Sequence, residues 1–168
     1  MATKFDSLQS LFEFEMREIY SFENQLVDAL PELIEIANDP WLKKEIAGYE
    51  SQAEKHLEIL REHFARLGIE PDDHECRAMK QLLDEAKALK TDGSDPRVRD
   101  AALIAILQRI EHLGMAAYGT AAAFADELGH HDIAAQLKQC RSDESNANSS
   151  IAGLAARWVN FMAAKASA

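Results

Sequence analysis

Apolar residues recur every three or four positions along four long segments of the chain, which is the spacing of helices that each bury one face. Breaks that contain proline or glycine separate the segments and give their ends. The four segments run from about Lys4 to Ala37, Pro40 to Leu67, Pro96 to Leu128 and His131 to Ala164. A shorter helix is predicted from about Pro71 to Lys90, and no segment shows the strict alternation of a β-strand. The pattern therefore predicts an all-α fold.

Each apolar stripe contains polar side chains at mid-length, where the helix should face the core. Burying a carboxylate costs several kcal/mol unless a partner compensates its charge. A shared metal ion is one such partner, and a network of buried salt bridges is the alternative. The residues concerned are Glu23 in the first segment, Tyr49, Gln52 and His56 in the second, Glu111 in the next long segment, and Glu144 and Asn148 in the last.

These polar residues also lie at similar depths when they are counted from the loops. Glu23 is 15 residues before Asn38 and His56 is 18 after it. Glu111 is 18 residues before Gly129 and Glu144 is 15 after it. At a rise of about 1.5 Å per residue the mismatch is at most roughly one turn. Tight loops make each pair antiparallel, and the long connection between the pairs can cross over lengthwise, so we expect a ferritin-like four-helix bundle with a short fifth helix in the crossover.

Composition narrows the class of protein. A length of 168 residues predicts a single domain that spans residues 1–168. The net charge of -11 argues against nucleic acid as a partner, because phosphate binding needs a clustered basic face. We also expect no membrane segment and a cytoplasmic location, since the first residues do not resemble a signal peptide. Cys76 and Cys140 have no CxxC spacing and are predicted to be core residues.

The donor types at the polar positions restrict which metal is expected. Carboxylates with an imidazole suit iron or manganese better than copper. The full di-iron pattern requires two Glu-x-x-His pairs, and neither the second nor the last long segment has a glutamate three residues before an inward histidine. We therefore predict metal ligands at Glu23, His56, Glu111 and Glu144. Gln52, Tyr49 and Asn148 are secondary candidates, and Tyr20 and Tyr118 are candidate hydrogen-bond donors to the acids.

The order of four motifs resembles the YciF-type family of bacterial stress-associated proteins over nearly the whole chain. The resemblance implies a cytoplasmic ferritin-like bundle, often a homodimer, that is induced in stress and has acids at the positions of Glu23, Glu111 and Glu144. A contact through Trp158 and Phe161 would fit a dimer, although both could instead fold back on the bundle end. The motifs are Tyr20-Ser21-Phe22-Glu23-Asn24-Gln25-Leu26 followed by Ala29-Leu30-Pro31, Cys76-x-Ala78-Met79-x-x-Leu82-x-x-Glu85-Ala86, Val98-Arg99-Asp100-Ala101-Ala102-Leu103-Ile104-Ala105, and Glu111-His112 followed by Ala117-Tyr118-Gly119-Thr120.

Four inward positions depart from that family pattern. Tyr49 stands for a histidine, Gln52 for a glutamate, Gly114 for a second glutamate and Asn148 for an aspartate. Each change removes a charge or a donor, and Gly114 is expected to leave a space for a small ligand or water beside Glu111. Two functions stay open. One is an iron- or manganese-binding stress protein that acts on oxygen or peroxide, and the other is a non-catalytic helical interaction module that has lost its metal site.

Overall fold

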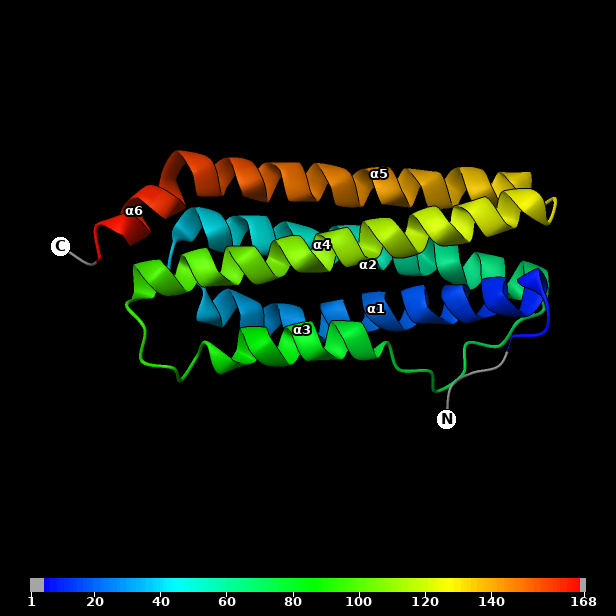
Figure 1. Ribbon diagram of the computed structural model, residues 1–168, viewed down its shortest axis with the longest axis horizontal. Coiled ribbons are helices and arrows are strands. Elements are labelled where there is room, and N and C mark those ends of the chain that lie inside the picture. The colour runs from blue at the N-terminus through cyan, green and yellow to red at the C-terminus, as the bar shows by residue number, and fades with distance from the viewer. Residues whose placement is uncertain (1–4, 167–168) are drawn as a thin grey trace.

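The computed structural model describes residues 5–166, and its long helices lie side by side with a short helix along one flank (Figure 1). The long helices are α1 (Leu8–Ile36), α2 (Pro40–Leu67), α4 (Pro96–Glu127) and α5 (His131–Leu154). The shorter elements are α3 (Arg77–Ala88), a π-helical turn η1 (Ala155–Val159) and α6 (Asn160–Ala164). Residues 5–166 contain no strand, so the all-α prediction is confirmed.

Connectivity follows the predicted crossover. α1 and α2 form one antiparallel hairpin and α4 and α5 form another, while the segment between α2 and α4 runs back along the bundle and carries α3 beside α1 (Figure 1). As a result α2 and α4 point in the same direction, as in ferritin-like bundles. α1 contacts α2 and α4, and α5 contacts the same two helices, so the four enclose one interior.

Local sequence determines where the helices begin and end. Ser7 forms a capping box with Ser10, so α1 begins at Leu8, and Lys4, where the sequence predicted its start, lies outside the described residues. Asp39 accepts hydrogen bonds from the first-turn amides of α2, and Pro40 follows as its first residue. Gly68 ends α2 with a φ of 64°, in the left-handed region that favours glycine.

The predicted start of α3 at Pro71 was wrong by about six residues. Residues 69–76 instead form an irregular segment that hydrogen-bonds to side chains of α1. Ser21 Oγ accepts from the amide of Cys76, Gln25 donates to the carbonyl of Cys76, and Arg17 donates to that of Glu70. Asp72, expected to open a helix, accepts from the amide of His74 in a local turn. These contacts compete with helix formation over the segment.

The last helix also differs from the continuous span predicted to Ala164. The π-helical turn η1 interrupts it after Leu154 and changes which residues face inward. Val159 is buried there, whereas Trp158 is 42% exposed. The indole Nε1 of Trp158 donates to Oδ2 of Asp39, 2.8 Å away. Phe161 is 54% exposed, so these two aromatic side chains do not fill the bundle end as core residues.

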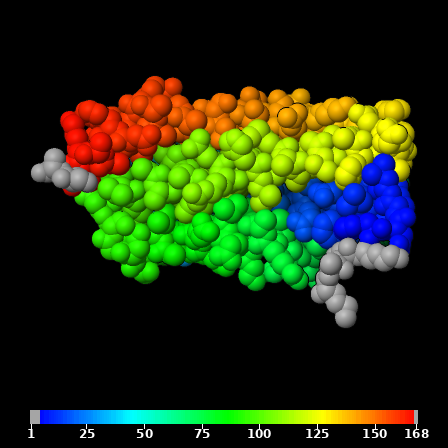
Figure 2. All heavy atoms as spheres, in the orientation of Figure 1, coloured from blue at the N-terminus to red at the C-terminus, as the bar shows by residue number. Residues whose placement is uncertain are grey.

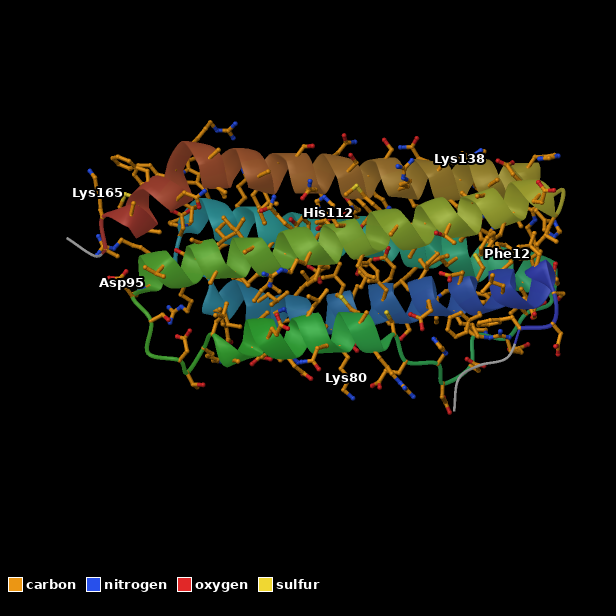
Figure 3. The ribbon with its side chains drawn as sticks, viewed as in Figure 1. Phe12, Lys80, Asp95, His112, Lys138 and Lys165 are labelled. Atoms are coloured by element: carbon orange, nitrogen blue, oxygen red, sulfur yellow. The ribbon has the colours of Figure 1, made fainter. Side chains whose placement is uncertain are left out.

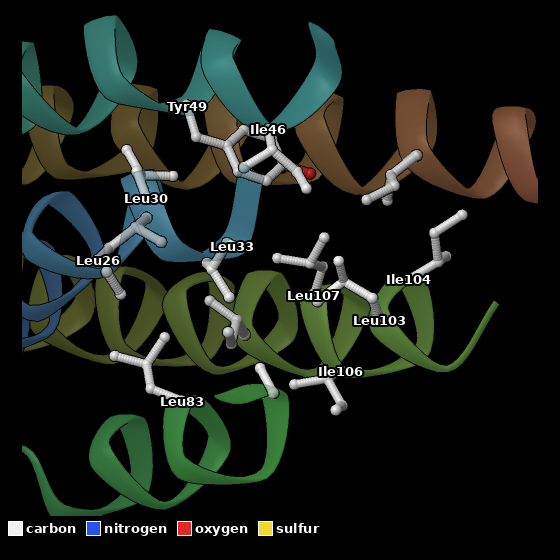
Figure 4. Close-up of a cluster of buried hydrophobic side chains, with 14 of the residues drawn as sticks. Leu26, Leu30, Leu33, Ile46, Tyr49, Leu83, Leu103, Ile104, Ile106 and Leu107 are labelled. Atoms are coloured by element: carbon white, nitrogen blue, oxygen red, sulfur yellow. The ribbon is translucent and has the colours of Figure 1, made fainter. Parts of the chain in front are cut away.

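Buried apolar residues form two clusters along the bundle. One contains Leu26, Leu30 and Leu33 of α1 with Ile46 of α2 and Leu107 of α4 (Figure 4). The other includes Phe12, which lies toward the opposite end of the bundle from Asp95 and Lys165 (Figure 3). His56 and Glu144 fall between the two clusters in the sequences of α2 and α5, and Glu23 follows Phe22, the first residue of α1 in the first cluster, so a polar layer crosses the core at mid-length. Among the described residues, no helix has the length and apolar character required to cross a bilayer.

Candidate metal centre

Three of the predicted site residues converge in the polar layer. Glu23 of α1, His56 of α2 and Glu144 of α5 each offer a ligand atom, and these atoms all lie within 4.8 Å of one another. The three residues are at most 2% exposed. Helical periodicity explains the convergence, because each residue lies on the inner stripe of its own helix at the level where the helices meet.

Glu23 is held by two neighbours. Its Oε1 lies 2.8 Å from Nδ1 of His56 and accepts a hydrogen bond of 2.5 Å from the hydroxyl of Tyr118. Tyr118 is buried beside His56, and the two rings meet edge to face with centroids 5.3 Å apart. The other carboxylate oxygen of Glu23, Oε2, is buried without a hydrogen-bond partner in residues 5–166. One carboxylate oxygen is therefore fixed and the other is free to bind a ligand.

Glu144 approaches the same place from α5. Gln52 donates a hydrogen bond of 2.9 Å to its Oε1, which lies 3.5 Å from Nδ1 of His56. Its other oxygen, Oε2, occupies the space beside Gly114, where an added β-carbon would overlap it. The sequence predicted an opening beside Glu111 for a small ligand or water. That prediction was wrong because the carboxylate of Glu144 fills the space that the glycine leaves.

The other predicted ligands surround this group. Glu111 is buried in the same layer but is not among the three residues whose ligand atoms converge, and its Oε2 has no hydrogen-bond partner in the described chain. Tyr49 is buried and its hydroxyl is unpartnered among residues 5–166. The half-buried Asn148 likewise has a buried side-chain oxygen, Oδ1, without a partner there. These three residues offer further polar atoms to the interior.

Two features of the site were not anticipated from the sequence. Asp143, which is partly exposed, places Oδ2 3.4 Å from Nε2 of His56, so the imidazole lies between an inner and an outer carboxylate. Its position next to Glu144, at the edge of the apolar stripe, was the signal that could have identified it. The expectation for Tyr20 was wrong, because its hydroxyl accepts from Arg61 and its ring packs on Phe64, away from the acids.

Burial and repulsion between neighbouring carboxylates determine the protonation of the side chains in the polar layer. Burial raises the pKa of Glu144, and the charges of Glu23 and Glu111 raise it further. The pKa of Glu111 is raised for the same reasons, burial first and then Glu23. For His56 burial lowers the pKa, but interactions with Cys140 and Glu23 outweigh burial and raise it. Without a cation, His56 therefore keeps its proton to higher pH beside Oε1 of Glu23, while Glu111 and Glu144 keep their protons to higher pH than exposed carboxyls.

The residues present fit a single hard or borderline cation. Carboxylate oxygens with one imidazole nitrogen are the donors that iron and manganese accept. The unpartnered Oε2 atoms of Glu23 and Glu111 are the buried acceptors that such an ion would satisfy. A second imidazole ligand is absent from the converging group, so the arrangement does not provide the symmetric set that two irons require.

Comparison with known proteins agrees with the fold and with the resemblance noted in the sequence. Protein YciF of Escherichia coli is 28% identical over 155 residues, which cover 92% of this chain and 93% of the relative. The crystal structure of that protein, called a stress protein, superposes with a TM-score of 0.88 at 28% identity and covers 93% of this chain and 99% of its own.

A second solved structure is YcfI from Rhodopseudomonas palustris, described as a proposed structural protein. It superposes with a TM-score of 0.83 at 33% identity and covers 90% of this chain and 96% of its own. The family model described as a domain of unknown function, DUF892, matches residues 7–164. The chain therefore belongs to the DUF892 family, which confirms the predicted kinship with YciF.

Proposed function

We propose that the protein binds an iron or manganese ion between Glu23, His56 and Glu144, and that it handles oxygen or peroxide during stress. The observation that carries the proposal is the convergence of two carboxylates and an imidazole within 4.8 Å in a buried layer. Such an ion would supply Lewis acidity and redox chemistry. The name of the E. coli relative, a stress protein, supports the physiological setting.

The chain's own residues would have distinct roles. Glu23 and Glu144 would bind through their carboxylates, and His56 through Nδ1, which faces both acids. Asp143 would accept from Nε2 of the same ring and fix its tautomer, as carboxylates commonly do for metal-bound histidines. Tyr118 and Gln52 would hold the two carboxylates in place. Glu111 would add its unpartnered oxygen as a further ligand.

Metal analysis of protein purified without chelator or affinity tag tests the proposal. We expect stoichiometric iron or manganese that is lost in Glu23→Ala and in Glu111→Ala. Glu50→Ala is the matched control, because Glu50 is an exposed glutamate on α2. A chain that stays metal-free after anaerobic loading with ferrous iron would contradict the proposal.

A non-catalytic interaction module is the second candidate. It is favoured by the hydrogen bonds that His56, Tyr118 and Gln52 already make to the acids, because these partly satisfy the carboxylates without an ion. The description of the Rhodopseudomonas relative as a proposed structural protein points the same way. In that case the Glu23→Ala variant would lose stability without any change in metal content.

Two expectations about the setting belong to the same proposal. A cytoplasmic homodimer fits the resemblance to YciF, and the exposed Trp158 and Phe161 offer apolar surface for a second copy. Light scattering on the protein as it elutes from a size-exclusion column gives the mass of the particle in solution directly. A monomer at micromolar concentration would remove the dimer from the proposal.

A further inference from the structure

A groove with a volume of about 260 Å³ lies between α1 and α4. Most of its wall is apolar, with Phe14 and Phe22 from α1 facing Leu113 and Ala117 from α4. α1 reaches the surface here between α4 and the segment that leads into α3 (Figure 2). Cys76, the residue before α3, also lines the groove.

The inner wall of the groove is next to the proposed metal site. Phe22 is 2% exposed and directly precedes Glu23 in α1. A β-carbon built at Gly114 would lie 3.2 Å from Cζ of Phe22 and would overlap Oε2 of Glu144. The phenyl ring and the carboxylate therefore flank one point beside α4, where glycine leaves no side chain between them. Phe22 therefore both lines the groove and lies beside the carboxylate of Glu144.

Size and polarity determine what the groove can hold. Its volume is below the range of about 300–1,000 Å³ typical of clefts for drug-sized ligands. Glu15 and Glu18, which also line the groove, disfavour anions. Phe14, Phe22 and Leu113 offer no ligand to a cation on the inner wall. A small neutral molecule is the occupant that meets all of these conditions.

We propose that this groove admits a small neutral molecule of the dioxygen class to the buried acids. Rotation of the Phe22 ring would open the last part of the route, between the groove and Glu144. The use of that route for chemistry rests on the proposed metal binding. The existence of the route does not, because the groove, the ring and Gly114 are features of the chain itself.

Xenon under pressure is a direct probe of the groove, since it occupies dry apolar cavities. In crystals of the full-length protein we expect a xenon atom against Phe14, Phe22 and Leu113. Ala116→Trp should abolish it, because Ala116 lines the groove and is exposed, so the indole can cover the opening without entering the core. Ala123→Trp is the matched control, at an exposed alanine two turns further along α4 that does not line the groove.

Nitric oxide, a neutral diatomic that binds ferrous iron reversibly, tests passage to the site. In stopped-flow mixing with the ferrous-loaded protein, Ala116→Trp should slow binding by about tenfold. Phe22→Leu should accelerate it, while Ala123→Trp leaves the rate unchanged. Phe12→Leu controls for general loosening, because Phe12 is a buried phenylalanine of α1 outside the groove. The iron content of each variant is measured alongside.

The outcomes separate this inference from the proposed function. Xenon absent from the groove, or equal nitric oxide rates in Ala116→Trp and Ala123→Trp, would overturn the route even if iron binds. A protein that fails to load iron but holds xenon against Phe22 would overturn the proposed function and support the groove.

Discussion

Nδ1 of His56 lies 2.8 Å from Oε1 of Glu23, and this buried pair joins α2 to α1 at the polar layer between the two apolar clusters. Both side chains are almost fully shielded from water. A buried charge in such a position requires a partner of opposite charge, because only their attraction offsets the free energy lost when the charge is removed from water. The pair therefore has consequences for stability whether or not a metal ion binds.

Glu23→Ala should destabilise the metal-free protein by about 3–5 kcal/mol, because it leaves the imidazole of His56 buried without its inner carboxylate. Denaturant unfolding in the presence of a chelator measures this. The control Glu50→Ala, on the solvent face of α2, should change the free energy of unfolding by no more than about 0.5 kcal/mol. Replacing both members of the pair by leucine should recover much of the loss, and a double variant as unstable as Glu23→Ala would show that the pair is not the cause.

Asp143→Asn should weaken metal binding by about 10–100-fold while leaving unfolding nearly unchanged. The reason is that Oδ2 of Asp143 lies 3.4 Å from Nε2 of His56, where it would orient the ring for binding through Nδ1. Titration with manganese followed by electron paramagnetic resonance gives the dissociation constant. Asp73→Asn, in the exposed connection before α3, serves as the control. Equal affinities in the two variants would exclude an orienting role.

Gly114→Ala should displace the carboxylate of Glu144 and lower metal content, because a β-carbon there would overlap Oε2 of that residue. Gly48→Ala provides a sharp contrast. Gly48 is an exposed helical glycine with nothing within 4 Å of the added carbon, so alanine should stabilise the protein by about 0.5–1 kcal/mol. The two variants are compared by metal analysis and thermal unfolding. Full metal content in Gly114→Ala would mean that Glu144 is not a ligand in its observed position.

Sequence periodicity was sufficient to predict the bundle, its crossover and the burial of Glu23, His56 and Glu144, because each property depends on one helix and on the loop lengths. Features that depend on contacts between elements were not predicted. The start of α3 is set by hydrogen bonds to side chains of α1, including the one that the amide of Cys76 donates to Oγ of Ser21, which no local pattern reveals. The use of the space beside Gly114 depends on a residue 30 positions away, Glu144.

The C-terminal part of the bundle shows the same limit. The sequence predicted one continuous helix to Ala164, but the π-helical turn shifts the helical pattern there, so that Val159 is buried and Trp158 is exposed. Asp143 was overlooked because it lies off the inner stripe, and it matters only through the ring of His56 on another helix.

His63 should make the protein less stable below about pH 6.5. It is fully buried, and neither ring nitrogen has a hydrogen-bond partner in residues 5–166. Burial, and then the charge of Arg66, lower its pKa in the folded state. The unfolded chain therefore binds the proton more tightly, so the contribution of His63 to stability is complete above its unfolded pKa and is lost as the pH falls, by at most about 1.4 kcal/mol per pH unit.

Urea unfolding of the wild type, His63→Leu and the exposed-site control His112→Leu between about pH 5 and 8 measures this. Only His63→Leu should flatten the acid side of the profile, and a profile that keeps the wild-type slope would assign the acid sensitivity to other groups.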